Sequence, residues 1–160
     1  MSATRTMGIG VTDVSTSQQL PLGFVYRQPA DATNNVGEKH WIYVYNDDAS
    51  SLVEGTICAR DDGTTTYDAI IAPVDTATIR VIGVAQHTIV AGSYGFIQRT
   101  GLGEVLADTG GITTNTALVV GNAVVGRADD VGAVTTHAFA FATEAATATN
   151  LATCMLNCTG

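Results

Sequence analysis

The stretch HWIYVY at residues 40–45 decides the fold class of this chain. It places three aromatic rings at alternate positions, with Ile42 and Val44 between them. Both faces of an extended segment would then carry large side chains, which is typical of a β-strand buried on both sides. The triplet NDD at residues 46–48 follows directly and predicts a turn, because Asn and Asp side chains bond nearby backbone amides.

Short segments of similar character recur along the chain and are separated by turn residues. The segments expected as strands are 41–45, 56–59, 67–72, 78–87, 92–100, 104–107, 117–120, 123–127, 138–142 and 154–157. Their spacing predicts an all-β fold, a small β-barrel or sandwich of about ten short strands. Gly83 and Gly95 lie inside two segments and indicate bulges or bends. The pair Gly121-Asn122 predicts a two-residue hairpin turn, and a helix at 143–152 is the one alternative to strand or loop.

The composition argues against nucleic acid and membranes as partners. Only 14% of the 160 residues are charged, below the usual value of about 25%. The net charge is −8, Lys39 is the single lysine, and the arginines are scattered rather than clustered on a basic stripe. No apolar stretch reaches the roughly 20 residues of a membrane span, and residues 1–10 lack the apolar core of a secretion signal. We therefore expect no direct nucleic-acid binding and no membrane association.

The first 37 residues differ in character from the rest. They are rich in Ser, Thr, Gln, Asn and Asp, and their clearest apolar run is Leu20–Tyr26. We predict an extended N-terminal arm at 1–37, ordered mainly by contacts with neighbouring subunits, and a β-barrel-like domain at 38–160. Aromatic side chains and arginines are enriched at protein interfaces. The residues predicted for intersubunit contact are Leu20, Phe24, Tyr26, Arg27, Trp41 and Arg99.

The triplet Asp108-Thr109-Gly110 is the sharpest apparent catalytic motif. It resembles the catalytic triplet of aspartic proteases, in which two such loops share one proton. A single copy would require a homodimer of the retroviral type, and residues 124–127 resemble the second signature of that family. Only about 15 residues separate the two motifs, which leaves no room for the flap between them. A turn built from Asp, Thr and Gly is the favoured interpretation.

The remaining reactive side chains form no motif. His40, His87 and His137 are too far apart in sequence to make a short metal-binding pair. The cysteines are odd in number and are interpreted as buried small apolar side chains. They are Cys58, Cys154 and Cys158. We predict no catalytic residues, no cofactor and no metal site, and hence a protein that is not an enzyme.

The stretch from the end of the predicted arm to residue 106 resembles the decoration, or cement, proteins of tailed-phage capsids. The resemblance spans residues 36–106, roughly half of the chain. It is carried by VGEK at 36–39, WIYVY at 41–45, LVEGT at 52–56, GVA at 83–85 and IVAGSYGFIQ at 89–98. It implies a β-barrel-like domain that trimerises on the outer surface of the capsid and clamps neighbouring capsomers.

The expected function is accordingly structural. The resemblance implies a virion protein on the outer capsid surface, a homotrimer whose partner is the major capsid protein, and a role in stabilising the shell. Another virion part, such as a spike, head fibre or tail component, is an alternative. A non-viral β-barrel binding module is a second alternative, and a retroviral-type aspartic protease is the least favoured one.

Overall fold

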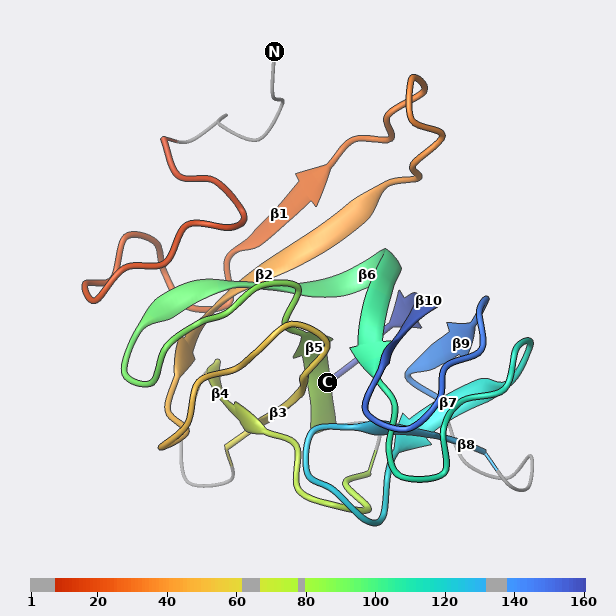
Figure 1. Ribbon diagram of the computed structural model, residues 1–160. Helices are drawn as coiled ribbons and strands as arrows, with labels where there is room; N and C mark the ends of the chain where they lie inside the picture. Colours follow the sequence, from red (N-terminus) through yellow and green to blue (C-terminus); the bar gives the residue numbers. More distant parts are fainter. Residues whose placement is uncertain (1–7, 62–66, 78–79, 132–137) are drawn as a thin grey trace.

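The computed structural model describes residues 8–61, 67–77, 80–131 and 138–160, and this part of the chain is all-β. Its strands follow one another along the chain with irregular connections between them (Figure 1). They are β1 (Val25–Gln28), β2 (Lys39–Asn46), β3 (Ile57–Arg60), β4 (Asp68–Ile71), β5 (Val81–Val84), β6 (Tyr94–Leu106), β7 (Ala117–Val120), β8 (Ala128–Asp130), β9 (Ala140–Ala142) and β10 (Leu151–Asn157). The prediction of an all-β fold, a small β-barrel or sandwich of about ten short strands, is confirmed.

Five of these strands close into a barrel. The order β2-β4-β3-β5-β6 returns to its start because β2 also pairs with β6, antiparallel, from Tyr45↔Tyr94 to His40↔Thr100. The remaining strands lie outside the barrel. β1 pairs with β2, and the sheet continues from β6 through β10, β9, β7 and β8. β1 and β8 therefore form the two ends of the strand order.

β6 is the strand that joins the barrel to the outer strands. Its first half pairs with β2 and its second half pairs with β10, from Thr100↔Asn157 to Leu106↔Leu151. The strand bends between these halves at Gly101, whose φ is +95°. The side-chain amide of Gln98 donates across the bend to the carbonyls of Thr100 and Leu102, at 3.1 and 2.9 Å. The two strands expected at 92–100 and 104–107 are thus one.

The apolar side chains form three clusters. One fills the barrel and includes Ile42, Val44 and Ile97, all fully buried. A second lies between the barrel and the outer strands and includes Leu118 and Phe139. The third, described below, lies under the segment that precedes β1. The period-two pattern of HWIYVY thus supplies side chains to two clusters, one on each face of β2.

Three local expectations differ from the structure. Residues 123–127 form a loop rather than a strand, so Gly121-Asn122 is not a two-residue hairpin turn. Residues 143–150 form bends and turns, and β10 begins at Leu151, so no helix occupies 143–152. β1 lies inside the segment expected to be an arm without a strand. The bulge expected near Gly83 is confirmed, because the β3–β5 register shifts between Cys58 and Ala59, opposite this glycine.

Candidate functional site

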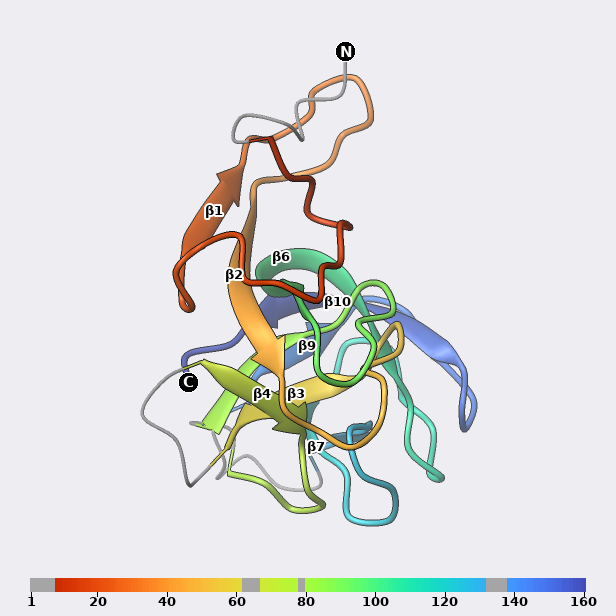
Figure 2. The same ribbon diagram turned by 90° about the vertical axis from the view of Figure 1, so that its left-hand side faces the viewer.

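The residues predicted for intersubunit contact in the arm lie together, against their own barrel. Leu20, Phe24 and Tyr26 are partly buried on a cluster that contains Trp41, which is only 5% exposed. We call this the arm cluster. Its members are Val11, Trp41, Tyr43 and Phe96, with Ile9, Leu20, Leu22, Phe24, Tyr26 and Tyr94 packed against them. The segment ahead of β1 runs beside β2 in both views (Figures 1 and 2).

Hydrogen bonds also tie the arm to β2. The amide of Tyr43 donates to the carbonyl of Phe24 at 2.9 Å, and the amide of Gly23 donates to the carbonyl of Tyr43 at 2.8 Å. The hydroxyl of Tyr43 accepts from the amide of Gln19 at 3.1 Å. Arm residues 19–24 are therefore ordered within one chain. In the structure these apolar residues pack against their own chain, and their contact with another subunit stays a prediction.

The ribbon formed by β1 and β2 projects beyond the barrel (Figure 2). Arg27 of β1 lies exposed on this ribbon. The guanidinium of Arg27 donates to Glu38 Oε1 at 2.9 Å, and His40 Nε2 lies 2.6 Å from the same oxygen. These contacts, first with His40 and then with Arg27, lower the pKa of the Glu38 carboxyl. The Arg27 side chain remains 68% exposed. Of the two predicted interface arginines, Arg27 is the more exposed.

Arg99 has a different role in the structure. Its Nε donates to the carbonyl of Cys158 at 3.0 Å, and its Nη2 donates to the carbonyl of Gly160 at 3.2 Å. The amide of Cys158 in turn donates to the Arg99 carbonyl at 3.0 Å. Arg99 thus holds the segment after β10 against β6. Its guanidinium is committed to backbone carbonyls of its own chain.

An exposed apolar surface lies on the outer face of β9 and β10. Met155 and Phe141 are register partners and are 48% and 46% exposed. Leu102 of β6 pairs with Met155 on its other side. Sequence reasoning did not single out this surface, although the alternation in LATCMLN at 151–157 contains the signal. Its odd-numbered side chains point outward and its even-numbered ones are buried.

Asp108 of the protease-like triplet is buried and bonded to the backbone. Its carboxylate accepts from the amides of Thr109, Ala123 and Val124 at 2.7, 3.0 and 3.3 Å. Desolvation raises the pKa of this carboxyl, but the three amides and the charge of Arg127 outweigh it, and the net pKa lies below the usual 3.8. The carboxylate therefore braces a loop, which is the turn-type role favoured by the sequence.

Among the described residues, the candidate metal-binding side chains form no metal site. In the described ranges no group of three or more His, Cys, Asp or Glu side chains is placed to hold a metal ion. His137 lies outside the described residues. Both ring nitrogens of His87 are buried without a hydrogen-bond partner, and burial lowers the pKa of this imidazole while Asp13 acts against it. All three cysteines are free and buried. No helix among the described residues has the length and apolar character to cross a membrane.

A solved phage structure has a similar fold. The chain is similar to the N base of the head fiber gp8.5 in bacteriophage phi29, with a TM-score of 0.56 and 18% sequence identity. The match covers 73% of this chain and 94% of that chain. The two proteins share a fold. No protein-family model matches this chain, and no curated protein sequence matches it.

Proposed function

We propose that this chain is a structural protein of a phage particle that binds the outer surface of the head. The fold shared with the head fiber base, over 94% of that chain, is the observation that carries the proposal. The resemblance of residues 36–106 to capsid decoration proteins supports the same assignment independently. In this function the protein binds the major capsid protein, bridges capsomers as a trimer and carries out no catalysis.

The exposed surfaces suit such a role. Met155 and Phe141 present apolar area on one side, and β1 and β8 leave strand edges at the two ends of the sheet. Strand edges can pair with another chain, and exposed apolar patches are common at binding sites. The net charge of −8 suits a position away from packaged DNA.

A second candidate is the base of a head fibre. The fold match favours it directly, since the similar structure is itself the base of such a fibre. A fibre base holds a further polypeptide on the head, whereas a decoration protein strengthens the shell. The two functions therefore differ in the effect of the protein on shell stability.

The test uses purified protein and phage heads that lack it. We expect cosedimentation with heads, a trimer by light scattering, and release of DNA at a higher temperature from heads that carry the protein. Binding without a change in the release temperature would favour the fibre base over the decoration protein. A monomer that does not sediment with heads would overturn both.

A further inference from the structure

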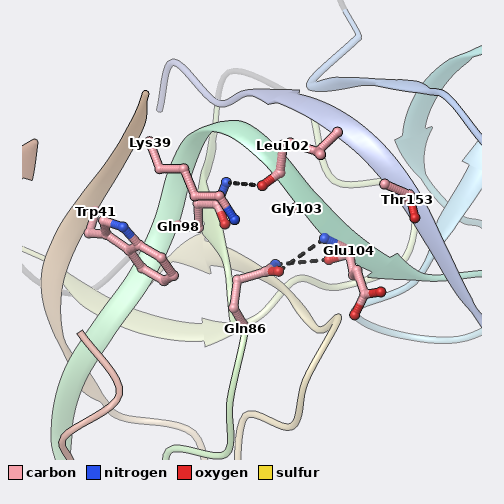
Figure 3. Close-up of a pocket in the computed structure, with 8 residues that line it drawn as sticks. All are labelled: Lys39, Trp41, Gln86, Gln98, Leu102, Gly103, Glu104 and Thr153. Carbon is pink, nitrogen blue, oxygen red and sulfur yellow. Dashed lines mark hydrogen bonds between the residues drawn. The ribbon is translucent and has the colours of Figure 1, made fainter. Parts of the chain in front are cut away.

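A pocket of about 360 Å³ lies where β2, the β5–β6 connection, β6 and β10 meet (Figure 3). Its volume is at the lower end of the range for small-ligand sites, about 300–1,000 Å³. The residues that give it chemical character are Lys39, Trp41, Gln86, Gln98, Glu104 and Thr153. Trp41 and Lys39 stand on one side and Glu104 and Thr153 on the other. The walls thus combine charged, amide, hydroxyl and aromatic groups.

Gln98 supplies the observation that points to a ligand. This side chain is fully buried and lines the pocket. Its amide nitrogen uses both hydrogens, on the carbonyls of Thr100 and Leu102, while Oε1 has no hydrogen-bond partner in the described part of the chain. If the nitrogen and oxygen of the Gln98 side-chain amide were exchanged, both hydrogen bonds would be lost, so the orientation of this amide is fixed. Buried polar atoms are rarely left unpaired, and an open acceptor in a polar pocket calls for a donor.

This acceptor has less than 1 Å² of exposed surface, so a ligand reaches it only when a neighbouring side chain moves, and a side chain at Gly103 would crowd it further. A Cβ atom at this position would lie 3.1 Å from Gln98 Oε1 and 2.9 Å from a methyl carbon of Leu156. The backbone at Glu104 is fixed from below, because the Gln86 side chain donates to its carbonyl at 2.9 Å and accepts from its amide at 3.0 Å. Both bonds are made by the backbone of Glu104 and neither uses its carboxylate, which stays available to a ligand.

The remaining groups that line the pocket include both hydrogen-bond donors and hydrogen-bond acceptors. Lys39 offers an ammonium donor, and Glu104 offers carboxylate acceptors of opposite charge. The hydroxyl of Thr153 donates to Glu144 Oε2 at 2.7 Å, so its oxygen is presented as an acceptor. One cation facing one carboxylate is a poor site for a phosphate, which prefers clustered cations or helix N-termini. Trp41 and Leu102 are the large apolar side chains among the lining residues, which is too little for a lipid chain.

A sugar hydroxyl can both donate and accept a hydrogen bond, so a sugar ring satisfies this mixed set. We propose that the pocket binds one neutral sugar ring of a glycan. Gln98 Oε1 and the Glu104 carboxylate accept hydrogen bonds from its hydroxyls, Lys39 donates to it, and Trp41, which is 5% exposed and whose indole N–H is bonded to Gln28 at 2.9 Å, borders the ring. Sugar binding is measured on the purified protein alone, so it stands or falls separately from attachment to phage heads.

Trp41 is the single tryptophan of the chain, so its fluorescence reports on the pocket directly. We expect a saturable change in this fluorescence on titration with at least one of glucose, galactose and N-acetylglucosamine. Backbone amide NMR shifts should move at Gln98, Gly103 and Glu104. Glu104→Gln should weaken binding at least about tenfold by removing a charged acceptor. Glu54→Gln removes the same charge from an exposed turn and should leave binding unchanged.

Thermal unfolding of Glu104→Gln shows whether the variant is folded. If it is not, Thr153→Val, which keeps the side-chain shape, replaces it and should also weaken binding. Absence of a saturable response to all three sugars would overturn the proposal. Equal affinity of the wild type and the pocket variant, or NMR shifts confined to another surface, would overturn it as well.

Discussion

The carboxylate of Asp108 accepts a hydrogen bond from the backbone amide of Ala123 at 3.0 Å, across 15 positions of sequence. Together with the bond from Val124, it fixes the loop that leads from β7 to β8. Gly121 lies so close that a Cβ there would be 2.2 Å from Asp108 Oδ2. The buried carboxylate and the glycine opposite it therefore form one structural unit.

Replacing Asp108 by Asn should destabilise the fold. Asn presents one neutral acceptor oxygen in place of a carboxylate that serves three amides, and its NH₂ group would face backbone donors. We expect the free energy of unfolding to fall by about 1–3 kcal/mol. Denaturant unfolding followed by Trp41 fluorescence measures this. Asp47→Asn, at an exposed position, is the matched control and should change stability by less than about 0.5 kcal/mol. An equal effect of both variants would contradict the role of Asp108.

The same carboxylate predicts how stability depends on pH. The pKa of Asp108 is lower in the folded protein than its usual 3.8. Its stabilising contribution is therefore fully present above the unfolded pKa and is lost as the pH falls through the folded pKa. The difference in stability between wild type and Asp108→Asn should be constant near pH 6–7 and shrink in acid, below about pH 4. Unfolding curves at a series of pH values test this, and a gap that widens in acid would refute it.

Much of the fold could be predicted from local patterns because its strands are rich in β-branched and aromatic residues. HWIYVY became β2, and 117–120 became β7 with the predicted bounds. The joining of 92–100 to 104–107 was missed, since Gly101-Leu102-Gly103 resembles a turn. The continuity of β6 depends on hydrogen bonds from Gln98 to carbonyls on both sides of the bend. β1 was missed because VYRQ is short, and its pairing with β2 is a long-range feature.

Less of the candidate site than of the fold could be predicted from the sequence. Leu20, Phe24 and Tyr26 could be recognised as apolar positions in a polar segment, but the surface they cover depends on how the arm turns back. Arg99 could not be distinguished from Arg27 by residue type, and only the position of the C-terminal segment separates their roles. The pocket could not be predicted from the sequence. Its lining residues, from Lys39 to Thr153, are far apart along the chain and only the fold brings them together.

Gly101 should not tolerate a side chain. Its φ of +95° is unfavourable for L residues, and a Cβ would lie 2.5 Å from the carbonyl oxygen of Glu38. We expect Gly101→Ala to lower the free energy of unfolding by at least about 1–3 kcal/mol, the usual range for such backbone strain. Gly37→Ala is the control, since a Cβ there meets no atom within 4 Å. Equal stability of the two variants would show that the bend in β6 is not constrained.

The cysteines should be unreactive in the folded protein. Burial raises the pKa of Cys58 to about 12 and of Cys154 to about 12, and it raises the pKa of Cys158 as well. Since the thiolate is the reactive form, alkylation by iodoacetamide at pH 8 should be slow until the protein is unfolded in guanidinium. Mass spectrometry counts the modified thiols. Ala49→Cys introduces an exposed thiol and should react rapidly in the folded protein. Rapid native labelling of the three natural cysteines would contradict their burial.

The two arginines predicted as interface anchors should respond differently to the same substitution. Arg99→Lys loses the planar fork that reaches the carbonyls of Cys158 and Gly160, and we expect the free energy of unfolding to fall by about 1–3 kcal/mol. Hydrogen exchange of the Cys158 amide, which is bonded to the Arg99 carbonyl, should become faster as the segment after β10 loosens. Arg27→Lys keeps a cation beside Glu38 on the exposed ribbon and should change stability little. If binding to phage heads weakens in Arg27→Lys while its stability is unchanged, Arg27 is an interface residue; if only Arg99→Lys affects binding, the segment after β10 is the contact instead.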